Sequence, residues 1–118
     1  MLSNIETGFS GESLAARWLG TQGFTILQRN FRHRRYEVDI IAGRNSVLHF
    51  IEVKCRHSTL YGHPEESVSR RKLEHVLQGS AGWLLHWPGH RRVQYDVLAI
   101  TLLPRQQPEY VLFEDVYL

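Results

Sequence analysis

Two carboxylates and a lysine near the middle of the chain have the residue types and spacing of a metal-dependent site that cleaves phosphodiesters. Asp39 lies in the segment EVDII (37–41), and Glu52 and Lys54 lie in the next apolar segment, FIEVK (50–54). Carboxylate oxygens are the ligands that Mg²⁺ prefers. A lysine beside them can stabilise negative charge that develops on a phosphate. These residues therefore predict a nuclease-type site.

The alternation of side chains along β-strands would bring these three groups together. Successive side chains point to opposite faces of a strand, so Glu52 and Lys54 share one face, and Glu37 and Asp39 share a face of the preceding strand. We expect the apolar residues between them on the other face, toward a core: Val38, Ile40, Ile51, Val53 and Cys55. Asp39, Glu52 and Lys54 converge if the hairpin register places the two charged faces together.

The predicted ligand set is suited to Mg²⁺ or Mn²⁺. Asp39 and Glu52 would supply carboxylates, and Val53 would supply its main-chain carbonyl. A bound metal lowers the pKa of a coordinated water and neutralises charge on the phosphate. Glu12 or Glu37 would be a third acid. Glu12 has a second explanation, because a carboxylate in the first turn of a helix interacts favourably with the helix dipole.

The elements that position these residues can be predicted from patterning and turn residues. We expect one domain over residues 1–118, of the α/β class, with a mixed sheet flanked by helices in the order α-β-β-β-α-β-β. Gly79 and Gly82 are unfavourable inside a helix and indicate close packing against a neighbour. The predicted segments are a helix at 10–20, a strand beginning at 24–27, strands at 36–42 and 47–55 joined by a turn at 43–45, a helix at 66–86, and strands at 93–101 and 110–113.

Composition excludes several classes of protein. No segment is long and apolar enough to span a bilayer, and we expect no membrane association. Cys55 is the only cysteine, which excludes an intrachain disulfide and favours the reducing cytoplasm. With one cysteine and no paired histidine spacing there is no structural zinc motif, and no GxxxxGK[ST] loop indicates an NTPase. Asp96, within an apolar strand, is expected to have a structural role.

Positive charge is clustered although the net charge is only +2. Clusters of this kind can follow a phosphate backbone, and they can equally be solvated surface. The candidate residues for nucleic-acid binding are Arg34, Arg35, Arg56, Arg71 and Lys72.

In these same residues the chain resembles the YraN-like family of small bacterial proteins, which is related to Holliday-junction resolvases and to the restriction-endonuclease-like fold. The matching motifs, in order, are G-x-x-G-E with A-A (8–16), R-N (29–30), EVDII (37–41), FIEVK-x-R (50–56), L-Y-G (60–62), S-V-x-x-x-K (67–72), A-x-x-L (81–84) and Y-D-V (95–97). The resemblance implies that Asp39, Glu52 and Lys54 form the PD-(D/E)xK nuclease signature and that Glu12 is the acid of the opening helix. Tyr36 stands where the family usually has glycine, and a tyrosine there would either crowd the approach to the metal or tighten a bend differently.

Three functions remain open from the sequence. The first is a metal-dependent endonuclease acting on DNA, in particular on branched DNA. The second is a nucleic-acid-binding module with a vestigial catalytic site that works through a protein partner. The third is a structural adaptor that binds no DNA. Resolvases of this fold often act as dimers, so a homodimer is compatible with the resemblance, but no residue requires one.

Overall fold

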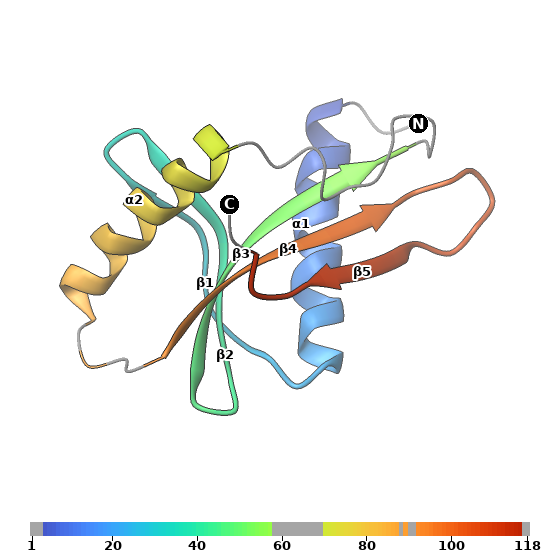
Figure 1. Cartoon of the computed structure of the whole chain (residues 1–118). Coiled ribbons are helices and arrows are strands. Elements are labelled where there is room, and N and C mark those ends of the chain that lie inside the picture. Colours follow the sequence, from blue (N-terminus) through green and yellow to red (C-terminus); the bar gives the residue numbers. More distant parts are fainter. Residues whose placement is uncertain (1–3, 58–69, 88, 90–91, 117–118) are drawn as a thin grey trace.

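The protein is an α/β domain with a five-stranded mixed sheet and two helices in the predicted order (Figure 1). The computed structural model describes residues 4–57, 70–87, 89 and 92–116. The elements are α1 (Asn4–Thr21), β1 (Thr25–His33), β2 (Tyr36–Arg44), β3 (Val47–Arg56), α2 (Arg70–His86), β4 (Val93–Thr101) and β5 (Glu109–Phe113). This confirms the α/β class and the element order expected from the sequence, and the arrangement is consistent with a compact nuclease-like fold.

The sheet has the strand order β1-β2-β3-β4-β5. Only the central β3·β4 pair is parallel, and its crossover contains α2. The helices lie on opposite faces, each with its own apolar cluster (Figure 1). On the α1 face Ala15 and Leu19 pack against the strands, and on the α2 face Val76 and Trp83 do so. Burial on both faces explains why 38–42 and 48–51 are mostly apolar in the sequence, interrupted by Asp39 and His49.

The β2–β3 hairpin turns later than the sequence predicted. We expected a turn at 43–45, but β2 continues through Arg44, which pairs with Val47. Asn45 and Ser46 form the two-residue turn, and both have positive φ (52° and 64°). Two-residue hairpins favour turns with positive φ at both positions because their twist matches that of the strands, and asparagine tolerates this conformation.

One other predicted boundary was wrong. The first helix begins at Asn4 and not at residue 10. The first strand begins at Thr25, within the predicted segment, and continues through the basic residues Arg29 and Arg32 to His33. Residues 66–69, expected at the start of the second helix, lie outside the described part of the chain.

The apolar residues of β2 change face between Val38 and Ile40. Val38 packs in the α2-side cluster, whereas Ile40 packs in the α1-side cluster, so our expectation that they share a face was wrong. On β1, Arg29 is opposite Ile40 and Phe31 is opposite Val38, and the residue between them, Asn30, has a φ of 53°. A left-handed residue of this kind rotates the local strand direction. Asp39 therefore lies where the face changes.

A buried polar network ties the C-terminal residues to the sheet. Nδ1 of His49 is 2.6 Å from Oδ2 of Asp96, and both side chains are buried. Oδ1 of Asp96 accepts hydrogen bonds from the main-chain N–H of Asp115 (2.9 Å) and the amide of Gln94 (3.1 Å). The structural role predicted for Asp96 is thus confirmed.

Among the described residues, no helix combines the length and hydropathy needed to cross a bilayer.

The glycines of α2 pack closely against the β1–β2 hairpin, as their positions predicted. A Cβ built on Gly79 would come 3.1 Å from Cγ2 of Val38, and one on Gly82 would overlap the imidazole of His33. We therefore expect Gly82→Ala to destabilise the protein by about 1–3 kcal/mol through overpacking.

The free energy of unfolding can be measured by urea titration monitored by circular dichroism, with Gly20→Ala as the matched control. A Cβ on Gly20 in α1 would meet nothing within 4 Å, so alanine there should be neutral or stabilising by up to about 1 kcal/mol. Equal unfolding midpoints for the two variants would contradict the close approach of α2.

Candidate active site

Asp39 is held at the point where β2 and β3 separate. Main-chain pairing between these strands runs from Arg44 and Val47 to Ile40 and Ile51. At the next step the main-chain N–H of Val53 donates to Oδ2 of Asp39, at 2.8 Å. The Asp39 carboxylate thus accepts the hydrogen bond that, in a continuous ladder, a main-chain carbonyl of the neighbouring strand would accept from Val53. This hydrogen bond fixes the position of the Asp39 side chain between the two strands.

Three carboxylates meet at this point. Glu12 comes from α1, and Glu37 and Asp39 come from β2, and one oxygen of each lies within 4.8 Å of the others. All three residues are half-buried. Carboxylates this close repel one another when ionised, and burial strengthens the repulsion. The cluster therefore favours a proton or a cation between its members.

The pKa of Asp39 shows this electrostatic environment. Burial of the carboxyl and the nearby charge of Glu52 raise the pKa from 3.8 to about 8, and the charges of Glu12 and Glu37 act in the same direction. The hydrogen bond from Val53 opposes the shift but does not cancel it. Without a cation, Asp39 is therefore largely protonated at neutral pH. A bound divalent cation would favour the ionised form.

Glu52 and Lys54 stand beside this cluster on β3. Nζ of Lys54 is 3.7 Å from Oε1 of Glu52, and their side chains are only 21% and 13% exposed. The effect of Glu52 on the pKa of Asp39 places its carboxylate in the same site, although Glu52 is not among the three carboxylates within 4.8 Å. Two strands and one helix thus bring four acids and a lysine to one region of the fold.

Two members of the site have contacts that the sequence did not indicate. Glu37 forms an ion pair with Arg32 of β1 at 3.4 Å, and the glutamate side chain is 37% exposed, so Glu37 marks the solvent side of the cluster. Val53 uses its N–H for Asp39 and packs its side chain on the α1-side core. Its carbonyl as a metal ligand stays a prediction.

The predicted basic residues are spread over three elements. Arg34 and Arg35 form the exposed turn between β1 and β2, Arg56 is half-buried at the end of β3, and Arg71 is exposed on α2. The side chain of Lys72 lies outside the described part of the structure. Arg35, Tyr36 and Arg71 line one hollow, which lies between the β1–β2 turn and α2. Nucleic-acid binding by these residues stays a prediction.

Tyr36 does not stand over the acidic cluster. Its ring contacts the imidazole of His75 on α2, with centroids 5.2 Å apart, and its Cβ is close to Gly79. The acids gather on the side from which Glu12 of α1 reaches the strands. Of the two effects considered for Tyr36, crowding of the metal does not fit this position, because alternation along β2 turns the ring toward α2 while Glu37 faces the cluster.

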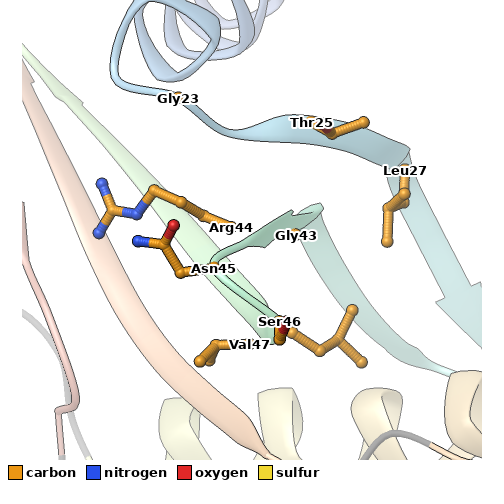
Figure 2. A pocket seen from close by; sticks show the side chains of 9 residues that line it. Gly23, Thr25, Leu27, Gly43, Arg44, Asn45, Ser46 and Val47 are labelled. Carbon is orange, nitrogen blue, oxygen red and sulfur yellow. The ribbon is translucent and has the colours of Figure 1, made fainter.

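Two other features resemble sites but lack the chemistry of the acidic cluster. A hollow at the turn end of the β2–β3 hairpin is lined by Thr25 and Leu27 of β1 and by hairpin residues such as Arg44 and Asn45 (Figure 2). None of the described residues that line it carries a carboxylate. His49, Asp96 and Glu114 also lie within 4.8 Å, but Glu114 is paired with Arg44 at 2.6 Å and Asp96 accepts three hydrogen bonds. These charges need no cation.

Comparison with known proteins places the chain in a family. The model of "Uncharacterised protein family UPF0102" matches residues 11–100. A UPF0102 protein of Chlorobaculum parvum is 49% identical over 107 residues, covering 87% of this chain and 83% of the relative. A UPF0102 protein from Chlorobium phaeobacteroides is 38% identical over 108 residues, which cover 91% of this chain and 85% of the relative. One from Rhodococcus opacus is 38% identical over 99% of this chain and all of its own.

The chain therefore belongs to the UPF0102 family, which is the YraN family that its motifs resemble. The matched segment includes Glu12, Asp39, Glu52 and Lys54.

The raised pKa of Asp39 predicts how stability depends on pH. A carboxyl that titrates near 4 when unfolded and near 8 when folded makes the folded state less stable as pH rises between these values. Asp39→Asn removes this titration, and its amide oxygen can still accept from Val53. In metal-free buffer we expect the variant to gain about 2 kcal/mol or more over wild type between pH 4.5 and pH 8.

Urea denaturation across this pH range, with a chelator present, provides the measurement. Glu109→Gln, an exposed change on β5, is the control and should follow wild type. A constant difference between Asp39→Asn and wild type would show that folding does not raise the pKa of Asp39.

Proposed function

We propose that this UPF0102 protein is a metal-dependent endonuclease of the PD-(D/E)xK type that acts on DNA. The observation that carries the proposal is the convergence of Glu12, Glu37 and Asp39 within 4.8 Å, next to Glu52 and Lys54. Glu37 and Glu52 each have a basic partner, Arg32 and Lys54 respectively. Burial and the charge of Glu52 nevertheless raise the pKa of Asp39 to about 8, and Glu12 and Glu37 add to the shift, as expected where carboxylates are held close enough to share a cation.

The donor set fits Mg²⁺ or Mn²⁺. Both are hard cations that prefer oxygen ligands, and every acidic group at the site offers carboxylate oxygens. Asp39, Glu52 and the carbonyl of Val53 would hold the ion, with Glu12 and Glu37 in support. When bound, the ion supplies an activated water and neutralises charge on the phosphate.

The protein's own residues would do the remaining work. Asp39 is oriented by the N–H of Val53, so its oxygens have a fixed direction. Lys54, held by Glu52 at 3.7 Å, would orient the attacking water or stabilise the developing charge on the phosphate. Arg34, Arg35, Arg56, Arg71 and Lys72 would bind flanking phosphates without regard to sequence.

The relationship to resolvases implied by the motifs favours branched DNA, and cleavage of two strands would need two sites in a homodimer. The single cysteine suits a reducing compartment such as the cytoplasm.

One observation favours the second function, a nucleic-acid-binding module with a vestigial site that works through a protein partner. Glu52 pairs with Lys54 and lies outside the group of three close carboxylates. The ligands therefore do not all surround one point in this structure. On this alternative, DNA binding would be salt-sensitive, and added metal would produce no cleavage.

A cleavage assay separates the two functions. Branched, single-stranded and duplex DNAs are incubated with Mg²⁺ or Mn²⁺, and products are resolved on denaturing gels. We expect cleavage of at least the branched substrate, with a loss of about 10²–10³-fold or more for Glu52→Gln and Lys54→Met. Calorimetric metal titration should show weaker binding for Glu52→Gln and near-normal binding for Lys54→Met.

Glu109→Gln is again the control and should retain wild-type cleavage. The assignment fails if cleavage persists in Asp39→Ala and Glu52→Ala. Salt-sensitive DNA binding with no metal-dependent product would support the binding module.

A further inference from the structure

We propose that the hollow between the β1–β2 turn and α2 is a pocket for an unpaired nucleotide, and this rests on the proposed action on DNA. The hollow is lined by Arg35, Tyr36, Arg71, Glu74, His75 and Gln78. It lies on the α2 side of β2, whereas the acidic cluster includes Glu12 of α1. It is thus a second site, separate from the acids.

The pocket combines cations with planar groups. The guanidinium of Arg35 lies over the Tyr36 ring, 5.3 Å from its centroid, and also donates to the tyrosine hydroxyl at 3.3 Å. The imidazole of His75 meets the same ring edge-on. Nucleobases that have left a duplex stack on aromatic rings and on guanidinium planes. Tyr36, Arg35 and His75 offer both kinds of surface in one place.

The remaining lining residues suit the other parts of a nucleotide. Arg71, on the first turn of α2, is exposed and can bind a phosphate oxygen with its guanidinium. Glu74 and Gln78 follow one helical turn apart along the same wall, and carboxylate and amide groups bond to base edges. Two cations against one acid give the pocket a net positive charge that favours a phosphate-bearing ligand.

The position of the pocket indicates which nucleotide it would receive. Tyr36 of the pocket and Glu37 of the acidic cluster are consecutive residues on β2, and their side chains point to opposite sides. A phosphodiester held at the acids therefore has its neighbouring nucleotides beside this strand. A paired base is retained in the duplex stack, so an unpaired base is the one that can reach round the β1–β2 turn into the pocket. The preferred substrate would carry unpaired bases next to the cleaved bond, as branch points and bulges do.

The test measures binding, so that it does not depend on cleavage. Two fluorescent hairpin DNAs of equal length are used with Ca²⁺ in place of Mg²⁺: one has a single unpaired 2-aminopurine and the other is fully paired. Wild type should bind the unpaired probe about tenfold more tightly, and its 2-aminopurine emission should fall on binding, as expected for one stacked base.

Two variants test the pocket. Arg71→Ala has Arg17→Ala as its matched control, because both arginines are exposed on helices. Tyr36→Leu has Tyr36→Phe as its control. We expect Arg71→Ala and Tyr36→Leu to lose most of the tenfold preference, and Tyr36→Leu to lose the quenching. Arg17→Ala and Tyr36→Phe should keep both. Circular dichroism and urea midpoints establish that each variant is folded.

The outcomes are separable from those of the cleavage assay. Loss of preference in these variants supports the pocket even if no DNA is cut. The pocket proposal is overturned if wild type shows no preference, if the preference survives in Arg71→Ala and Tyr36→Leu, or if both variants lose affinity equally for the paired and unpaired probes. The last result would leave a plain phosphate contact, and cleavage could still occur.

Discussion

The site depends on one hydrogen bond, from the main-chain N–H of Val53 to the carboxylate of Asp39. It lies where the main-chain pairing of β2 and β3 ends, and there a side-chain carboxylate accepts the hydrogen bond in place of a main-chain carbonyl. Because Asp39 is anchored there, its charge lies in a half-buried position near Glu12, Glu37 and Glu52, and its pKa rises to about 8. The fold carries this unfavourable electrostatic energy in the absence of a cation. Preorganised groups of this kind allow an ion to bind without rearranging the protein.

Much of the fold could be predicted because local patterns and tertiary packing agree. The mostly apolar segments 36–42 and 47–55 predicted the two strands, and Gly79 and Gly82 indicated the close approach of α2 that the structure contains. The turn at Asn45 and Ser46 was missed because Gly43 is the stronger turn former, whereas Arg44 stays in the strand through pairing with Val47. Strand pairing, a non-local interaction, here outweighed the local preference.

The residues that form the candidate site could be predicted from the sequence, but the directions in which their side chains point could not. The spacing of Asp39, Glu52 and Lys54 follows from alternation on two paired strands. The change of face between Val38 and Ile40 does not follow from the pattern, since it involves Asn30 on another strand. Whether Tyr36 would crowd the metal or only alter a bend could not be decided from the sequence. Its contact with His75 requires knowledge of where α2 lies.

The buried pair of His49 and Asp96 has a mechanical consequence for the site. Together with the Arg44–Glu114 ion pair and the hydrogen bond from Asp115, it braces the turn end of the hairpin against the C-terminal residues. The two strands are therefore clamped at one end and splay only at the other, where Asp39 sits. A change in the separation of the strands beside Asp39 would therefore have to bend the strands or break the contacts at the turn end.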